Sequence, residues 1–312
     1  MALRTQPFTI LIAVVALGIV GAAIVGVTYF LEQVVKPETV ALQTIKQQQE
    51  APDSVPDPGA KEFETAVGLI RSGELISARE RLAYILRYYP ESAKHAEAKR
   101  VLGEINLDLL LSDAPVPGKI RYVVKSGDSG LAAIASRHKT TVDCIVRANG
   151  LTGNVIHPGD EYWLTPLIFT LEAKLARREL IVYRVENPEV VDASPDAGVS
   201  ASGSVGPVEV FFKSYPILDA NLPPTVKLPS AAEISDKPAW LSNGKRAVFG
   251  TPGYHAAHRW LQTARPGLVL QAAPEDSQRA TVERNAGILL APADMNELYT
   301  YIRTGTELRL TE

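Results

Sequence analysis

The first pattern in the chain is a long apolar run close to its beginning. Residues Phe8–Leu31 contain no charged side chain, and about twenty apolar residues are enough for a helix to span a bilayer. The run is not followed by the small-x-small cleavage site of a signal peptide, which favours an uncleaved transmembrane anchor over a signal peptide. Arg4 precedes the run, so we expect a cytoplasmic N-terminus and extracytoplasmic C-terminal domains.

A polar linker and a helical segment follow the apolar run. Residues 32–60 are rich in Gln, Pro, Asp and Glu, which is typical of a spacer. Residues 61–112, called the helical segment below, have strong helical periodicity. A recognisable spacing is carried by Ala66, Leu69, Gly73, Ala78, Leu82, Ile85 and Pro90, and a further helix is expected over His95–Leu111.

The next part, residues 119–166, is called the short module. Its β-branched and aromatic run Tyr122–Val124 predicts a strand, and two short apolar periodicities beginning at Leu131 and Val142 predict two helices. Asn149-Gly150 breaks the second helix, and Tyr162–Leu164 predicts a closing strand. The expected order is strand, helix, helix, strand.

Residues 167–312, called the C-terminal domain, change to a strand pattern. Runs of apolar residues at Leu167–Phe169, Leu180–Tyr183 and Val208–Phe212 predict strands. Between the last two, Asn187–Pro207 is rich in Ala, Ser, Gly, Pro and Asp and predicts a loose loop. We therefore expect a β-rich domain with an insertion.

Composition excludes several kinds of function. The 312 residues carry a net charge of −3 and no basic excess, so nucleic acid is not an expected partner. The five histidines and one cysteine form no metal-ligand spacing, and no cofactor motif is present. Cys144 falls in the second helix of the short module, where its neighbours favour a buried small residue over a nucleophile.

The short module resembles a LysM domain in the order of its residues. It has an aromatic-Val strand, a Gly-Asp turn at Gly127-Asp128, an Asn-Gly break and a Pro-Gly turn at Pro158. LysM domains bind N-acetylglucosamine-containing glycans, in bacteria usually peptidoglycan, between two loops. The resemblance implies a glycan-binding groove made of Gly127, Asp128, Ser129, Gly130, Asn149, Gly150, Leu151, Ile156 and Pro158.

Each of these residues also has a purely structural interpretation, in which the glycines and Pro158 shape turns and Asn149 caps a helix. The groove interpretation fits an uncharged sugar, which backbone amides and apolar contacts can hold without ion pairs. Gly130 departs from the family pattern, because it follows the usual small hydroxyl residue as an insertion before the first helix.

The C-terminal domain resembles the frame of an L,D-transpeptidase, a family that attacks peptide stems with a cysteine activated by histidine. The family's motifs I-H-G-T and S-H-G-C-I-R align, without gaps, with the residues that begin at Leu270 and at Arg284. The first histidine is replaced by Gln271, the second by Asn285, the cysteine by Gly287 and the arginine by Leu289. Gln and Gly supply neither a base nor a nucleophile, so the resemblance implies an inactive domain.

The helical segment resembles one tetratricopeptide repeat, which implies two antiparallel helices that approach through small residues and an end of the second helix at Pro90. One such repeat needs neighbours to bury its apolar face. The segment is either a spacer packed on the rest of the chain or on another copy, or a surface for protein partners. The predicted fold class is a multidomain α+β protein with a transmembrane helix (8–31), a linker (32–60), the helical segment (61–112), the LysM-like module (119–166) and a β-rich domain (167–312).

The predicted function is binding of peptidoglycan by a single-pass inner-membrane protein whose C-terminal domains lie outside, with a catalytically inactive C-terminal domain. Two alternatives stay open. The first is an active cell-wall L,D-transpeptidase or another peptidoglycan-remodelling enzyme, which would need a nucleophile such as Cys144 or a serine. The second is a scaffold that recruits cell-wall enzymes through the helical segment or the C-terminal domain.

Overall fold

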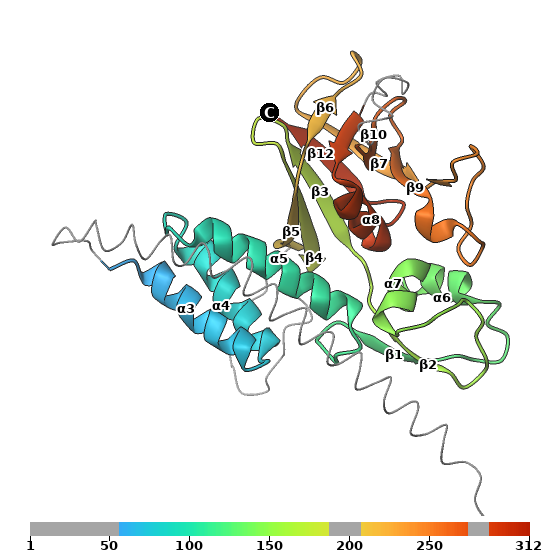
Figure 1. The fold of residues 1–312 in the computed structure, drawn as a ribbon, viewed down its shortest axis with the longest axis horizontal. Helices are drawn as coiled ribbons and strands as arrows, with labels where there is room; N and C mark the ends of the chain where they lie inside the picture. The colour runs from blue at the N-terminus through green and yellow to red at the C-terminus, as the bar shows by residue number, and fades with distance from the viewer. Residues whose placement is uncertain (1–55, 187–206, 274–286) are drawn as a thin grey trace, which may run out of the picture. The chain divides into compact units, whose positions relative to one another are not determined.

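The computed structural model describes residues 56–186, 207–273 and 287–312 (Figure 1). Within these ranges no helix has the length and apolar character needed to cross a membrane. The predicted transmembrane helix, Phe8–Leu31, lies outside them, as do most of the predicted linker and of the predicted loop Asn187–Pro207. The predicted fold class is therefore wrong in its membrane span, and the described structure is a β-rich domain with a few helices.

The helical segment consists of α3 (Pro58–Arg71), α4 (Leu75–Tyr88) and α5 (His95–Leu111). Helix α3 begins before the expected start at Lys61, because Asp57 caps it by accepting a 2.9 Å hydrogen bond from the Gly59 N–H and Pro58 occupies its first turn. Small and branched residues fill the contact between α3 and α4, and Ala66, Ala78, Leu82 and Ile85 are fully buried there.

The short module has the expected order of elements: β1 (Ile120–Val123), α6 (Leu131–Arg137), α7 (Val142–Ala148) and β2 (Glu161–Leu164). Strands β1 and β2 pair antiparallel, with Ile120 opposite Leu164. The two helices cover one face of this pair and share a small core with it, formed by Tyr122, Val124, Leu131, Ile134, Ala135, Ile145, Tyr162 and Leu164.

The C-terminal domain is built on one mixed sheet in the order β5-β4-β3-β12-β7-β9-β10-β11-β6, with β8 paired to β9. Helix α8 (Pro292–Tyr301) packs against β9 and β10. The strands are β3 (Phe169–Lys174), β4 (Glu179–Glu186), β5 (Val208–Pro216), β6 (Asp219–Asn221), β7 (Ser230–Asp236), β8 (Ala239–Trp240), β9 (His258–Thr263), β10 (Val269–Ala272), β11 (Gly287–Leu290) and β12 (Glu307–Thr311), and a 3-10 turn, η3 (Tyr254–Ala256), precedes β9.

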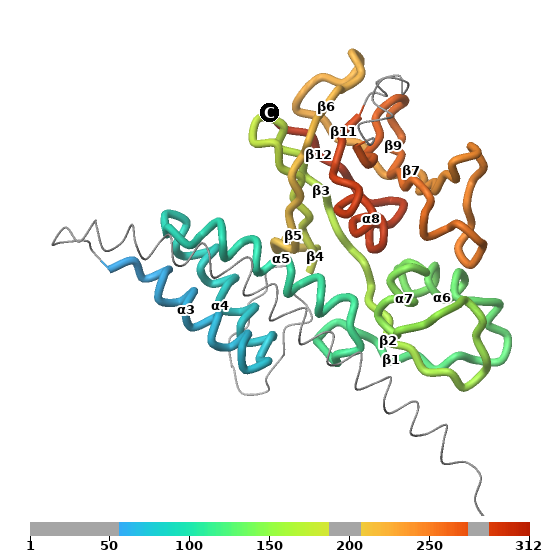
Figure 2. The backbone as a smooth tube through the Cα atoms, viewed as in Figure 1, coloured from blue at the N-terminus to red at the C-terminus, as the bar shows by residue number. Residues whose placement is uncertain are grey.

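Residues 57–312 form one compact unit in which the helical segment packs on the C-terminal domain. Helix α5 lies against β5, where the Asn106 side-chain amide donates a 2.8 Å hydrogen bond to the Phe212 carbonyl. The Lys213 ammonium on the same strand donates to Glu104 of α5 at 2.7 Å. Figure 2 follows the chain from α5 through the short module into β3. The segment thus buries its apolar face within its own chain.

The short module also contacts the C-terminal domain, through α7. The Tyr254 hydroxyl of η3 donates to Asp143 of α7 at 2.8 Å, and the Thr141 hydroxyl donates to the Thr300 carbonyl of α8 at 2.5 Å. Cys144 lies in the same contact and belongs to the core of the C-terminal domain. The module is therefore attached by packed side chains as well as by its two chain connections.

Candidate functional site

The first loop of the short module, between β1 and α6, is held by the carboxylate of Asp128. One carboxylate oxygen accepts hydrogen bonds from the Tyr122 hydroxyl at 2.7 Å and from the Lys125 N–H at 2.9 Å. The other accepts from the Arg137 guanidinium at 2.9 Å. The Lys125 N–H, the Tyr122 hydroxyl and the Arg137 guanidinium lower the pKa of Asp128 to about 2. Its carboxylate is committed to shaping the loop.

The second loop repeats this arrangement before β2. Asp160 accepts hydrogen bonds from the His157 N–H at 2.8 Å and from the Tyr162 hydroxyl at 2.9 Å, and these bonds lower the pKa of Asp160. Burial and the bond to Asp160 raise the pKa of Tyr162 to about 12. In the sequence this arrangement is indicated by two Gly-Asp pairs, each near a strand tyrosine. The hydrogen bonds between Asp and Tyr cannot be predicted when each loop is considered alone.

Two backbone hydrogen bonds bring these loops together. The Val124 N–H donates to the Asp160 carbonyl at 2.8 Å, and the Gly159 N–H donates to the Val124 carbonyl at 2.9 Å. The turn that contains Pro158 therefore lies beside the start of the loop that contains Gly127, Asp128, Ser129 and Gly130. The two loops are therefore neighbours through the backbone contact of Val124 with Gly159 and Asp160.

The predicted residues at the end of α7 are held by contacts with α7 and β2. The Asn149 side chain donates to the carbonyls of Ile145 and Trp163 at 2.8 and 2.9 Å and accepts from the Trp163 N–H at 2.7 Å. Its amide thus joins α7 to β2, as in the structural interpretation. Gly150 and Leu151 follow it, and among the described residues no hydrogen bond joins them to the first loop.

The groups that remain available for a ligand are backbone amides and exposed small side chains. Gly127, Ser129, Gly150 and Pro158 are exposed, whereas Leu151 and Ile156 are partly buried against the module's core. Within the described residues, the N–H groups of Gly127 and Ser129 donate no hydrogen bond. Gly127 adopts a φ of 103°, which a residue with a side chain rarely tolerates. This loop can offer unpaired amide donors to the oxygens of an uncharged ligand.

The second predicted site lies on β10 and β11 of the C-terminal domain. These strands are parallel neighbours in which Gln271 pairs with Leu289 and Gly287 pairs with Val269. Gln271 and Gly287 thus lie on adjacent strands, and α8 packs against β10. Arg284 and Asn285 lie outside the described residues.

The backbone at Gly287 has no room for a side chain. Its φ is 154°, and a Cβ atom added there would stand 2.2 Å from the Val269 carbonyl oxygen. Gln271 is buried, with 7% of its surface exposed. A cysteine at position 287 would therefore require the two strands to move apart.

Cys144 is unsuited to nucleophilic attack in this structure. It is 1% exposed, and burial raises the pKa of its thiol to about 11. Reactive cysteines need a thiolate and access, and Cys144 has neither near neutral pH. Among the described ranges there is also no group of three or more His, Cys, Asp or Glu side chains that could hold a metal ion.

Comparison with known proteins assigns a family to part of the chain. Residues 122–162 match the family model of the LysM domain. The chain carries a LysM domain in the short module. No curated protein matches the chain.

Solved structures give a distant likeness to the chain. The L,D-transpeptidase C442S mutant of Enterococcus faecium is 16% identical at a TM-score of 0.27, covering 49% of this chain and 53% of its own. The L,D-transpeptidase of Mycobacterium smegmatis is 10% identical at a TM-score of 0.28, and the match covers 49% of this chain and 64% of that protein. A fused Zn-dependent amidase, peptidase and peptidoglycan-binding protein of Clostridium acetobutylicum is 9% identical at a TM-score of 0.28, and the match covers 46% of this chain and 51% of that protein. The chain spans about half the length of the first and third of these structures.

Proposed function

We propose that this protein binds peptidoglycan through the LysM domain and that its C-terminal domain does not turn over a substrate. The match at residues 122–162 carries the first half of the proposal. It is supported by the loop at Gly127 and Ser129, whose unpaired amides suit a neutral sugar better than an ionic ligand. Because peptidoglycan lies outside the cytoplasmic membrane, the same proposal places these domains on that side.

The second half of the proposal rests on the absence of a nucleophile and base at the positions that the L,D-transpeptidase pattern requires. Gly287 has no side chain, Gln271 cannot take a proton near neutral pH, and Cys144 is buried as a thiol. The enzyme alternative would therefore need another nucleophile, such as a serine.

Glycan binding is tested by co-sedimentation of the full-length chain with purified peptidoglycan. Ser129→Tyr places a bulky ring in the exposed loop and should weaken binding about tenfold or more, because it covers the Gly127 and Ser129 amides. Ser136→Tyr is the matched control, since Ser136 is exposed on α6 of the same domain. Raising the salt concentration should change binding little, as the contacts are uncharged. Equal binding by the two variants would contradict the proposal.

Inactivity is tested by incubating the full-length chain with tetrapeptide stems and looking for cross-linked product. We expect none from the wild type, nor from Gly287→Cys, in which the new side chain would collide with the Val269 carbonyl. Overpacking of this kind costs about 1–3 kcal/mol of stability, so thermal unfolding of Gly287→Cys should occur at a lower temperature. Cross-linking by the wild type would show that the enzyme alternative is right.

The scaffold alternative stays a prediction. It would be favoured if the Ser129→Tyr chain, once unable to bind peptidoglycan, still replaced the wild type in normal cell-wall growth.

A further inference from the structure

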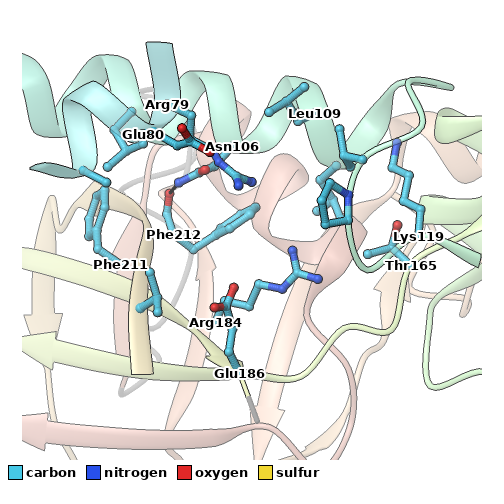
Figure 3. A pocket seen from close by; sticks show the side chains of 16 residues that line it. Arg79, Glu80, Asn106, Leu109, Lys119, Thr165, Arg184, Glu186, Phe211 and Phe212 are labelled. Atoms are coloured by element: carbon cyan, nitrogen blue, oxygen red, sulfur yellow. Dashed lines mark hydrogen bonds between the residues drawn. The ribbon is translucent and has the colours of Figure 1, made fainter. Parts of the chain in front are cut away.

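A pocket lies where the helical segment meets the C-terminal domain, away from both sites described above. It has a volume of about 180 Å³ and opens between α4 and α5 on one side and β4 and β5 on the other. Figure 3 shows Arg79, from α4, and Arg184, from β4, entering it from opposite sides, with Phe212 between them. A cavity needs only about 10–15 Å³ of such volume to hold one water molecule, so the pocket has room for a small organic ligand.

The two arginines in this pocket have no carboxylate partner within residues 56–186, 207–273 and 287–312. Among the described residues, neither the Arg79 nor the Arg184 guanidinium takes part in a hydrogen bond or an ion pair. Burial, together with the positive charge of Arg79, lowers the pKa of Arg184, while Glu186 opposes that effect. A partly buried guanidinium without partners is costly, and an incoming anion would remove that cost.

The remaining charges around the pocket favour an anion of single charge. Glu80 and Glu186 line its rim and are exposed, so their charges are screened by solvent but still disfavour a doubly charged phosphate. Lys119 also lines the pocket, but its ammonium already donates to the Ser112 carbonyl. A planar carboxylate matches the fork of a guanidinium and carries one charge.

The floor of the pocket is apolar and has one unused polar atom. Phe211, Phe212 and Leu109 form apolar surface, and the Asn106 amide is held by its bond to the Phe212 carbonyl. The Thr165 hydroxyl is buried at the same pocket and has no hydrogen-bond partner among the described residues. A ligand with a carboxylate for the arginines, a polar backbone group for the Thr165 hydroxyl and a small apolar side chain for the phenylalanine surface would fit this pocket.

We propose that this pocket binds a carboxylate of a short peptide between Arg79 and Arg184, with a small apolar group of the peptide against Phe212. The carboxylate belongs either to the C-terminal residue or to an acidic side chain. This site is separate from the LysM loops and does not depend on glycan binding.

The ligand class is tested by calorimetric titration of the purified full-length chain with three probes. They are acetyl-alanyl-alanine with a free carboxylate, its C-terminal amide, and acetyl-glutamic acid α-amide. We expect at least one carboxylate probe to bind at least tenfold more tightly than the amide, because charge-assisted hydrogen bonds are lost with the charge. The carboxylate probe that binds more tightly shows whether the pocket takes a C-terminal carboxylate or that of an acidic side chain. Equal binding of all three, or no binding by either carboxylate, would overturn the proposal.

The pocket is tested by substituting its arginines. Arg184→Gln and Arg79→Gln should each weaken binding of the better probe about tenfold or more, whereas Arg100→Gln, at an exposed position of α5 outside the pocket, should not. Arg79→Gln decides the matter if Arg184→Gln fails to fold. Co-sedimentation with peptidoglycan should be unchanged in these variants, which separates this site from the LysM domain. Unaltered probe affinity in a folded Arg79→Gln chain would overturn the assignment.

Discussion

At the scale of single residues, the LysM loops separate side chains that hold the groove from those that can contact a ligand. Asp128 and Asn149 were both predicted as glycan contacts, and the polar atoms of both side chains are engaged within the domain. The Asp128 side chain is also only 3% exposed, whereas the N–H groups of Gly127 and Ser129 donate no hydrogen bond within the described residues. The single sequence could not make this distinction, because the partners Arg137 and Trp163 lie on other elements.

Asp128→Asn tests the role of the first loop. The pKa of Asp128 is lowered to about 2 in the folded chain from about 3.9 in an unfolded one. The stabilisation is therefore fully present above about pH 4 and is lost as the pH falls toward about 2. The substitution should lower the melting temperature at pH 7 and weaken its dependence on acid. Asp113→Asn is the control, because Asp113 is exposed in the connection before β1. Identical acid profiles for the two variants would contradict this role.

At the scale of elements, the contact between α3 and α4 depends on small residues. Ala66 and Ala78 are fully buried where the two helices meet, so a larger side chain must displace a neighbour. Ala78→Leu should lower the free energy of unfolding by about 1–3 kcal/mol. Ala96→Leu, at an exposed position on α5, should change it by less than about 0.5 kcal/mol. Urea unfolding of both variants measures the difference, and equal stability would mean that this contact is loosely packed.

Elements with a strong local pattern could be predicted, and those that depend on distant partners could not. Helix α5 runs from His95 to Leu111 as its periodicity indicates, and β1, α6, α7 and β2 occur in the expected order. The start of α3 was missed because Asp57-Pro58 resembles linker composition, although it is also a helix cap. Strands β6 and β8 are two or three residues long, so each is defined by its neighbour in the sheet and has no periodicity of its own.

At the scale of the whole molecule, the arrangement of the parts was not predictable from the sequence. Residues 61–112 were expected to need a partner for their apolar face, and the structure supplies β5 of the same chain. Nothing in the local pattern of Asp143 or Cys144 indicated that α7 faces the C-terminal domain. Such contacts join residues more than 100 positions apart, for example Asp143 and Tyr254, and a single sequence carries no signal for pairings at that separation. Gly287 differs from these residues, because its residue type alone was enough to exclude a nucleophilic side chain at that position.

The junction between the LysM domain and the C-terminal domain should give the molecule a distinctive response to alkaline pH. Lys237 lies there, and its ammonium donates a 2.6 Å hydrogen bond to the Tyr299 carbonyl and sits 4.3 Å from the centre of the Tyr299 ring. Burial lowers the pKa of Lys237 to about 8; the nearby positive charge of Arg259 acts in the same direction, and Asp143 opposes it.

An unfolded lysine has a pKa of about 10.4, so between about pH 8 and 10 the unfolded chain holds a proton that the folded chain has released. Lys237 therefore contributes a rise in the free energy of unfolding with pH in this window. The buried thiol of Cys144 opposes this rise above about pH 8.5, because its pKa is about 11 in the folded chain and about 8.5 in an unfolded one. Above about pH 10 the buried Tyr254 opposes the rise as well, because its pKa is raised in the folded chain and it ionises more readily when unfolded. Lys237→Met should remove the contribution of Lys237, whereas Lys245→Met, at an exposed position of the same domain, should keep it. Urea midpoints of wild type and variants at pH 7.5 and 9.5 decide the matter: the change in midpoint should be less favourable in Lys237→Met than in the wild type, and an equal change in the two would show that Lys237 keeps its proton in the folded junction.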